Sequence, residues 1–533
     1  MRTDGGYPHR GMRRALYLPM VSSMSRRSRV GGRLPAAGFA PALALTLALT
    51  GTAAQAQAAA AEHPRPPVWT DCPADPSGAP VDPALRCTTV RVPLDYRKPD
   101  GRTIEIAVSR LATAKPGLRR GVLVHNGGGP GVASLHLPSA TAAGYPREVL
   151  DRYDLIGFDP RGVGHSTPVT CGRTPAEVPW QRVFPFPAPD GSIAPNTRFA
   201  RDLARDCLAA GGDLVRHLTT ADTARDLDRI RAALGERRIS YRAASYGTYL
   251  GAVYAELFPG RTDRLVLDAN VDPNTTWQQR LASWDAGAEL RFADFAAWAA
   301  ERDADLHFGA TPAAVRAGYL ALAAALDRAP VRHPVAGPVD GNLWRTLYRL
   351  DSYHTALFPE IADWWSYLAA GGTGPVPYWW LDKPATPGVP ADNDIAAFVA
   401  VLCNDTPADR DPARYQRAVT ESRARNPISA GMGADITPCA FWPAPAEPAV
   451  RVTDRGPANI LLLQTTRDPA TPYAGALGMR AALGQRARMV TVDGGNHGAY
   501  DPGTPSCAVT AADRFLATGT LPARDLACRP DPA

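Results

Sequence analysis

Three residues have the types and the chain order needed for nucleophilic catalysis. Ser245 lies in the run AASYG (243–247), between an apolar strand-like segment and a helical stretch. Asp468 in "TTRDPATP" and His497 in "GGNHGAY" each follow a buried strand-like run, 29 residues apart. A serine hydroxyl is a good nucleophile only when a base takes its proton. The chain order Ser245, Asp468, His497 predicts that His497 is this base and that Asp468 fixes its tautomer and stabilises the imidazolium.

The serine motif departs from the usual G-x-S-x-G elbow because Ala243 stands where the first glycine is expected. The positions two before and two after the serine must be small, since strand and helix cross there. Gly247 meets this need, and we expect a slightly wider crossing to admit the methyl group of Ala243. Alone, this motif is weak, and Asp468 alone would be a turn or helix-cap residue. The prediction rests on the three residues together.

A glycine-rich loop, "HNGGGPG" (125–131), follows another buried strand-like run. Consecutive glycines let the backbone approach a ligand closely. We expect the N–H of Gly128 or Gly129, together with that of Tyr246, to stabilise a developing oxyanion. The alternative is a flexible turn, but Pro130 indicates a loop of defined shape.

A second polar loop, "DPRGVGHS" (159–166), is expected to support the glycine-rich loop. Asp159, Arg161 and Gly162 are predicted to build a tight turn by ion pairing and hydrogen bonding. His165 precedes the serine in the chain, so it is a poorer candidate for the base than His497.

Strand-like runs that alternate with helical patterns must position these residues. The eight runs are 88–96, 103–111, 121–131, 153–162, 238–245, 263–273, 459–469 and 488–498. This pattern predicts an α/β fold with a mostly parallel eight-stranded sheet and helices on both faces. Because sites in such sheets lie at the carboxyl ends of the strands, the candidate residues are expected at one edge.

The alternation stops between 274 and 457, a segment rich in Trp, Tyr, Ala and Pro without a clear strand. We expect a mainly helical cap inserted into the core, giving an export region (1–60), a first core part (61–273), the cap (274–457) and a C-terminal core part (458–533). The aromatic residues of the cap can form its own core or line a substrate pocket, and the first alternative is favoured.

The first 60 residues have the pattern of an export signal. Arginines precede an apolar run that ends in small residues suited to cleavage near Ala56 or Ala58. The run is short and rich in alanine, which argues against a permanent membrane anchor. Arg26-Arg27 weakly resembles a twin-arginine signal, and a translation start at Met20 or Met24 stays open. The chain is therefore expected to be secreted.

Export changes the interpretation of the eight cysteines, all of which follow the expected cleavage point. An even number in an oxidising compartment predicts disulfides. Connectivity is not determined by sequence alone; our preferred pairs join sequence neighbours: Cys72–Cys87, Cys171–Cys207, Cys403–Cys439 and Cys507–Cys528.

Composition excludes several function classes. The net charge is +6, and no dense basic patch with interleaved aromatic residues occurs outside the N-terminus, so nucleic-acid binding is not expected. The chain has no C-x-x-C pair, and His125, His165 and His497 lack ligand spacing. We expect neither a metal nor another cofactor.

The motifs "NGGGPG", "DPRGVGHS", "TARDLDRIRAALG", "SYGTYLGAVYAELFPGRTDRLVLDANVDP" and "TRDPATP…GGNHG" resemble the secreted prolyl and tripeptidyl aminopeptidases of actinobacteria. The resemblance covers about 85–275 and 400–530, including "VLCND" and "PCAFWP", and is looser in the cap. The family usually has glycine at position 243 and often "NPGGPG" at the glycine-rich loop. Neither departure removes a reacting group.

This resemblance implies an α/β-hydrolase with a TAP-like C-terminal region, the triad Ser245, Asp468 and His497, and release of short N-terminal peptides. An aminopeptidase also needs a carboxylate for the substrate ammonium. Candidates are Glu360, Asp363 and Asp405, each of which has a structural or solvated role as its alternative. A carboxylesterase or amidase acting on hydrophobic esters is the second hypothesis, and an inactive binding fold the third. The substrate is expected to be a short peptide or small ester; the oligomeric state stays open.

Overall fold

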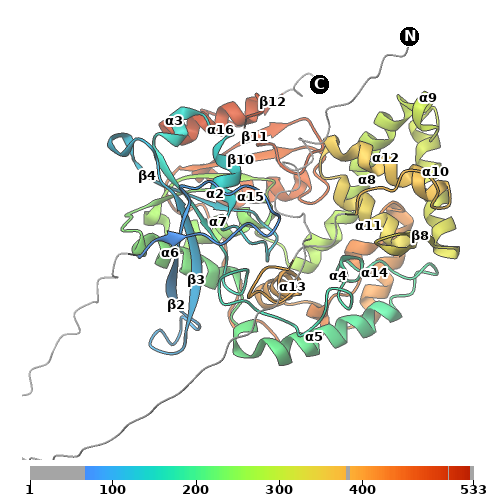
Figure 1. The fold of residues 1–533 in the computed structure, drawn as a ribbon, viewed down its shortest axis with the longest axis horizontal. Helices are drawn as coiled ribbons and strands as arrows, with labels where there is room; N and C mark the ends of the chain where they lie inside the picture. The colour runs from blue at the N-terminus through green and yellow to red at the C-terminus, as the bar shows by residue number, and fades with distance from the viewer. Residues whose placement is uncertain (1–66, 380–384, 502, 529–533) are drawn as a thin grey trace, which may run out of the picture.

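The computed structural model describes residues 67–379, 385–501 and 503–528 (Figure 1). The predicted export region, with its cleavage point and alternative start sites, lies outside these residues. Within the described part of the chain, no helix is long and apolar enough to cross a membrane.

A ten-stranded sheet forms the core, in the order β1-β2-β3-β5-β4-β6-β7-β10-β11-β12. The strands from β5 to β12 pair in parallel, whereas β1, β2 and β3 pair antiparallel at one end. Their bounds are β1 Thr70–Asp71, β2 Arg86–Pro93, β3 Thr103–Leu111, β4 Gly121–Asn126, β5 Tyr153–Phe158, β6 Ile239–Ala244, β7 Thr262–Asp268, β10 Ile460–Thr465, β11 Ala487–Val492 and β12 Leu526–Cys528.

The α/β class is confirmed, but the expected count of eight strands is wrong by two. The additional strands, β1 and β12, lie at the two edges and contain two and three residues. Runs this short leave no alternating pattern in the sequence. Each additional strand carries or adjoins a cysteine that is bridged to a longer element, Cys72 to Cys87 and Cys528 to Cys507.

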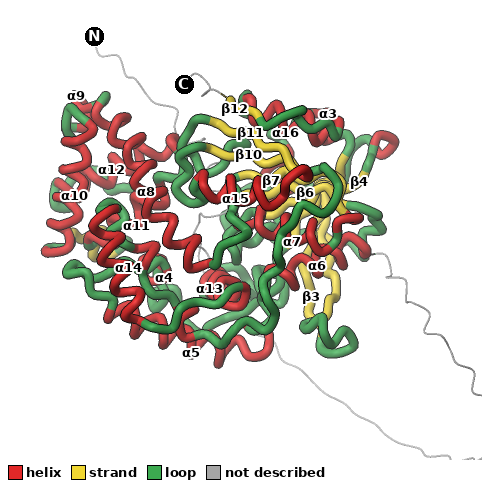
Figure 2. Tube along the Cα trace, turned by 180° about the vertical axis from the view of Figure 1, so that it is seen from behind, coloured by secondary structure: helices red, strands yellow, loops and turns green. Residues whose placement is uncertain are grey.

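Helices cover both faces of the sheet, as predicted. Val122 and Val124 of β4 pack in the same apolar cluster as α6 (Thr220–Ala233) and α7 (Tyr246–Leu257), whereas Leu123 packs with α16 (Cys507–Thr518) on the other face. This alternation follows from the two-residue period of a strand. Figure 2 shows the strands enclosed between these helices.

The segment 274–457, which we call the cap, lies beside the sheet (Figures 1 and 2). Its helices are α8 (Trp277–Ala300), α9 (Asp303–Leu306), α10 (Pro312–Arg328), α11 (Gly341–Asp351), α12 (Phe358–Ala369), α13 (Asn393–Asp405) and α14 (Pro412–Arg425). Many of its aromatic side chains, such as Trp344, Trp364 and Tyr319, are buried in a separate apolar cluster, which fits the favoured alternative of a cap core.

Two features of this region were not expected. The cap contains a short antiparallel pair, β8 (Val331–His333) and β9 (Gly337–Val339). In addition, α4 (Trp180–Val183) and α5 (Ala194–Val215), which the sequence assigned to the first core part, pack against α11, α13 and the 3-10 turn η5 (Pro438–Phe441). The boundary between core and cap therefore stays a proposal.

All four preferred disulfide pairs are present in the structure. The bridges close loops with sequence separations of 15 to 36 residues. Each such closure reduces the entropy of the unfolded chain and is worth roughly 3 kcal/mol. Four disulfides fit a protein that folds in an oxidising compartment.

Candidate active site

Ser245 occupies a sharp turn between β6 and α7. Its φ is +58°, a left-handed conformation that costs a non-glycine residue on the order of 1 kcal/mol. The turn is held from both sides: the Ser245 N–H donates to the Asp268 carbonyl (2.9 Å), and Thr248 donates its N–H and hydroxyl to the Ser245 carbonyl. The half-buried hydroxyl is thereby raised above the carboxyl edge of the sheet.

The crossing below Ser245 is as tight as the sequence predicted. A Cβ added to Gly247 would lie 2.6 Å from the Ala243 Cβ and 2.7 Å from the Asn126 Oδ1. The strand and helix thus accommodate one methyl group at position 243 only because position 247 has none.

We therefore expect Gly247→Ala to lower kcat about 100-fold and to reduce stability by about 1–3 kcal/mol, since overpacking shifts the elbow. Ala243→Gly is the matched control and should stay within about threefold of the wild type. The double variant removes one of two clashes and should recover part of the lost rate. Steady-state kinetics and thermal unfolding test this, and a fully active Gly247→Ala enzyme would contradict the crossing geometry.

Asp468 and His497 form a hydrogen-bonded pair at the same sheet edge. The His497 Nδ1 lies 2.9 and 3.0 Å from the two Asp468 carboxylate oxygens. Asp468 also accepts the N–H groups of Ala470 and Thr471 (both 2.8 Å) and the Thr471 hydroxyl (2.9 Å). These donors fix the carboxylate, which in turn fixes the ring with Nε2 available for proton transfer.

The environment keeps Asp468 ionised. Its burial opposes the charged form, but His497 and the N–H groups of Thr471 and Ala470 outweigh this effect and lower the pKa of Asp468 below its ordinary value. Among the described residues, no hydrogen bond joins the Ser245 hydroxyl to His497. Such bonds often form only when substrate enters.

The glycine-rich loop lies directly against Ser245. A Cβ added to Gly128, whose φ is +90°, would lie 3.1 Å from the Ser245 Cβ and 3.6 Å from the Tyr246 nitrogen. Only glycine permits this approach of loop to elbow. The N–H of Gly128 is engaged by the Asn126 Oδ1 (3.0 Å). Of the two loop donors predicted, Gly129 is therefore the better candidate, with the N–H of Tyr246.

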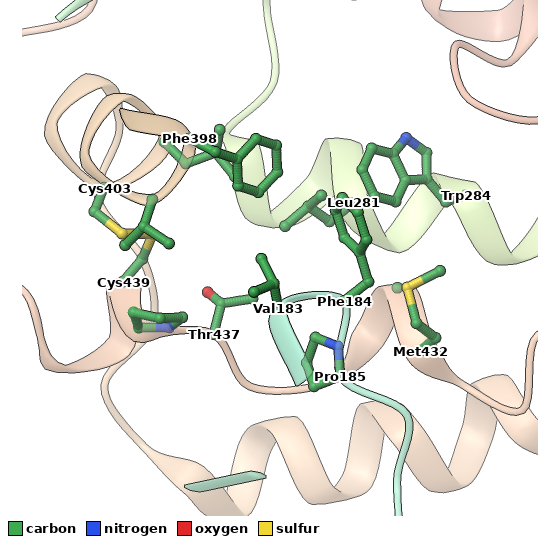
Figure 3. A pocket seen from close by; sticks show the side chains of 14 residues that line it. Val183, Phe184, Pro185, Leu281, Trp284, Phe398, Cys403, Met432, Thr437 and Cys439 are labelled. Carbon is green, nitrogen blue, oxygen red and sulfur yellow. A yellow bond between two sulfur atoms is a disulfide. The ribbon is translucent and has the colours of Figure 1, made fainter. Parts of the chain in front are cut away.

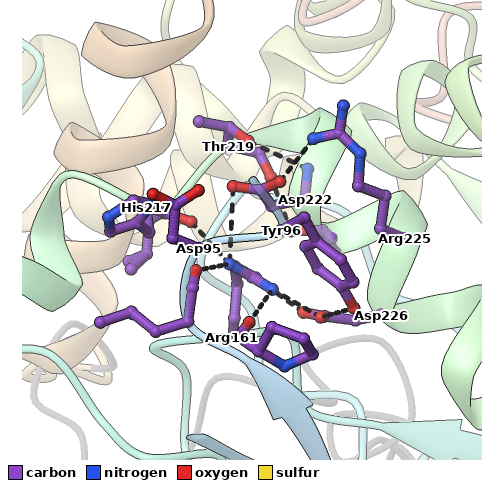
Figure 4. A network of polar contacts seen from close by, with 12 residues as sticks. Asp95, Tyr96, Arg161, His217, Thr219, Asp222, Arg225 and Asp226 are labelled. Carbon is purple, nitrogen blue, oxygen red and sulfur yellow. Dashed lines mark hydrogen bonds and ion pairs between the residues drawn. The ribbon is translucent and has the colours of Figure 1, made fainter. Parts of the chain in front are cut away.

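The loop 159–166 supports the glycine-rich loop through Ser134, whose hydroxyl accepts the N–H of Gly127. Asp159 accepts the N–H groups of Ser134, Leu135 and His165. The expected ion pairing within this loop is wrong: Arg161 is fully buried and pairs with Asp226 of α6 instead, with Nη2 2.6 Å from Oδ1. Figure 4 shows this contact. Burial raises the pKa of Asp226, although Arg161 opposes the shift.

Asp268 is a site residue that the sequence reasoning missed. At the end of β7, its carboxylate accepts the N–H groups of Ala499 and Tyr500, and its carbonyl accepts the N–H of Ser245. One residue thus holds both the loop of His497 and the serine elbow. The motif "LVLDANVDP" contains it, but an acid at a strand end has turn formation as its default interpretation.

The cap also contacts the candidate base. The His497 N–H donates to the Tyr353 carbonyl (2.7 Å), and the two rings lie 4.8 Å apart between centroids. The neighbouring Asn496 Oδ1 accepts the N–H and hydroxyl of Thr355. Burial, with His497 as a nearby charge, lowers the pKa of His354 to about 4. The segment 353–355 therefore forms one wall beside His497.

The three predicted amine anchors lie in different surroundings. Asp405 is buried at the end of α13, where its oxygens accept the N–H and hydroxyl of Thr220 and the Trp277 indole N–H. This arrangement supports the structural alternative for Asp405. Glu360 is partly buried and Asp363 exposed on α12, so both stay predictions.

A small apolar cavity lies between the cap and residues 183–185, and Figure 3 shows its walls, among them Phe184, Trp284, Phe398 and Met432. None of the proposed triad residues lines it. It adjoins the site through Phe398, because a Cβ added to Gly131 would lie 3.0 Å from the Phe398 nitrogen. The cavity is therefore next to the glycine-rich loop.

A buried acid near this cavity predicts a pH effect on stability. Burial raises the pKa of Asp435 to about 7, although hydrogen bonds from Asn196 and Ile436 oppose the shift. The folded state therefore keeps a proton that the unfolded chain releases at lower pH. This contribution to stability is present below the unfolded pKa and is lost as pH rises through 7.

We expect Asp435→Asn to gain about 2 kcal/mol of stability relative to the wild type between pH 5 and pH 8, because the amide does not titrate. Denaturant unfolding at the two pH values measures this gain. Asp100→Asn, on an exposed turn, serves as control. An equal stability difference at both pH values would show that Asp435 titrates normally.

Among the residues that the structure describes, no group of three or more His, Cys, Asp or Glu side chains is arranged to hold a metal ion. At the carboxyl edge of the sheet, the described residues form a serine elbow, an Asp–His pair and a glycine-rich loop. This arrangement can carry out acyl transfer through a serine ester.

Comparisons with known proteins cover most of the chain. Residues 426–528 match the family model described as TAP-like protein. The tripeptidyl aminopeptidase of Streptomyces lividans is 35% identical over 476 residues, spanning 87% of this chain and 86% of the relative. Carboxylesterase B of Mycobacterium tuberculosis is 33% identical over 472 residues, spanning 84% and 86%. Serine protease Hip1 of the same organism is 30% identical over 500 residues, spanning 87% and 91%.

Proposed function

The chain belongs to the α/β-hydrolase family that includes the tripeptidyl aminopeptidase of Streptomyces lividans, and on this basis we propose that it is an exported serine aminopeptidase that releases short peptides from the N-terminus of its substrates. The observation that carries the mechanism is the pair His497–Asp468 at the same sheet edge as the strained Ser245 elbow. The four disulfides support folding after export.

In the proposed mechanism, His497 takes the proton of Ser245 while the serine oxygen attacks the scissile carbonyl carbon. The N–H groups of Tyr246 and Gly129 stabilise the oxyanion. The intermediate then collapses: the C–N bond breaks, His497 gives its proton to the leaving amine, and an acyl-enzyme remains. Water repeats the sequence and releases the N-terminal product. Asp468, held ionised, stabilises the imidazolium in both halves.

A second candidate function is a carboxylesterase, which the 33% identical carboxylesterase B relative favours. The cavity next to the glycine-rich loop is lined by apolar side chains, but its volume of about 20 Å³ holds little more than one water, so it favours neither function. Both functions use the same triad, so the leaving group and the free amine distinguish them.

The test compares three substrates: a tripeptide p-nitroanilide with a free amino terminus, its N-acetylated form and a short p-nitrophenyl ester. An aminopeptidase cleaves the first much faster than the second, because only the first has the ammonium that an acidic anchor recognises. Cleavage of the ester together with failure on both anilides would overturn the peptidase proposal and support the esterase.

A further inference from the structure

Arg349, on α11, is a buried cation with unused hydrogen-bond donors. Its relative exposure is 4%, and among the described residues its Nε and Nη1 have no hydrogen-bond partner. Its Nη2 donates to the Tyr353 hydroxyl at 3.2 Å. The carboxylate of Asp285 interacts with this guanidinium electrostatically, but no hydrogen bond joins the two among the described residues. Because unpaired buried donors are costly, they point to a group outside the described residues.

The position of Arg349 relates it to the candidate site. Its guanidinium carbon lies 4.1 Å from the ring centroid of Trp284 and 5.8 Å from that of Phe184, and both rings line the apolar cavity. Tyr353, which it also contacts, packs its ring against His497. Arg349 therefore stands between the cavity and the candidate base.

Burial and unpaired donors do not by themselves identify a substrate-binding arginine, as Arg280 illustrates. It is 7% exposed, and its two Nη atoms also lack partners among the described residues. However, it is stacked on Tyr249 and Trp277, neither of which lines the apolar cavity. Tyr249 lines a separate pocket instead, which none of the proposed triad residues lines. Arg349 differs in having the cavity on one side and the wall of His497 on the other.

We propose that Arg349 binds an oxygen of the substrate, either the terminal carboxylate of a short peptide or a main-chain carbonyl. This deepens the proposed function and rests on it. A guanidinium presents a planar set of donors that suits such acceptors. It repels an ammonium, so the substrate amine binds away from Arg349. Arg349 is thus a substrate-binding residue for the same site.

The experiment replaces Arg349 by Met, which keeps an apolar stem against Trp284 and removes the donors. One tetrapeptide is assayed as its free acid and as its C-terminal amide. Binding of a carboxylate predicts that Arg349→Met raises KM about 10- to 100-fold for the acid and little for the amide. Binding of a main-chain carbonyl predicts an equal rise for both. An unchanged KM for both substrates would overturn the proposal.

Thermal unfolding separates this role from a structural one. Arg349 makes one hydrogen bond, to the Tyr353 hydroxyl, so Arg349→Met should change Tm little. Arg345→Met, one turn earlier on α11, is the matched control: Arg345 pairs with Asp327 at 3.1 Å, so its loss should lower Tm and leave KM unchanged. A lower Tm with unchanged KM in Arg349→Met would assign Arg349 to the fold and refute the proposal.

A parallel assay with a p-nitrophenyl ester of an N-acyl amino acid distinguishes failure of the two proposals. If the wild type cleaves the ester but no peptide, the peptidase function is wrong, while a rise in KM for the ester in Arg349→Met still supports carbonyl binding. If the wild type cleaves the peptides and Arg349→Met matches it, only the role of Arg349 is wrong.

Discussion

Replacing Ser245 by alanine is expected to lower kcat by about 10⁴- to 10⁶-fold on any substrate that the enzyme cleaves, because no acyl-enzyme can form. Residual hydrolysis would come from the oxyanion donors and from substrate positioning. The fold should survive: the backbone bonds of the turn, from Ser245 to Asp268 and from Thr248 to Ser245, do not use the hydroxyl. Burst kinetics and labelling by a fluorophosphonate probe measure the loss directly.

The control for this experiment is Ser366→Ala, an exposed serine on the cap helix α12. It should retain wild-type kinetics and probe labelling. A Ser245→Ala enzyme that folds and still hydrolyses substrate at the wild-type rate would show that another group is the nucleophile. Peptide mapping of a labelled residue elsewhere would lead to the same conclusion.

Asp468→Asn should produce the second-largest effect, a fall in kcat of about 10⁴-fold. In the wild type, the two carboxylate oxygens of Asp468 accept hydrogen bonds from the His497 ring, two backbone N–H groups and the Thr471 hydroxyl. An asparagine amide has only one oxygen that can accept such bonds. Any orientation of the amide either turns an N–H toward His497, which selects the wrong tautomer, or leaves a backbone donor unpaired. The imidazolium also loses its counter-charge.

Asp493→Asn is the matched control, because Asp493 is a surface carboxylate that pairs with Arg467 near the same histidine loop. It should leave kcat within about twofold. Circular dichroism and thermal unfolding establish that Asp468→Asn is folded before its rate is interpreted. A folded Asp468→Asn enzyme with more than a tenth of the wild-type kcat would exclude Asp468 as the third member of the triad.

Much of this fold could be predicted from the sequence, because most strands are apolar or alternating runs bounded by turn residues. The eight predicted runs correspond to strands β2 to β7, β10 and β11. The two missed strands at the sheet edges are too short to show a period. The β8–β9 pair in the cap was missed for the same reason. Helix α6 was expected at 219–235 and spans Thr220–Ala233, with the Thr219 side chain accepting the N–H of Asp222.

The chemistry of the candidate site could also be predicted from the sequence, because the residue types that follow each strand limit the reactions that its loop can support. The order Ser245, Asp468, His497 and the glycine run at 127–129 are properties of the chain itself. The question raised by Ala243 needed coordinates, since it depends on the 2.6 Å that would separate two Cβ atoms at the crossing. An amino-acid sequence does not give that distance.

The sequence by itself determined the fold class and the candidate nucleophile, base and acid, because these depend on local pattern, chain order and residue chemistry. The four disulfide pairs were a preference among many connectivities until the structure showed them. Only the tertiary structure decided that Asp268 holds both the serine elbow and the histidine loop, and that Asp405 has its oxygens occupied by Thr220 and Trp277. It also decided that Arg349 contacts Tyr353 and has two donors without a partner among the described residues. These properties depend on which side chains from distant segments meet in a buried space. There, the presence or absence of a partner decides whether a charge stabilises the fold or remains available for a ligand.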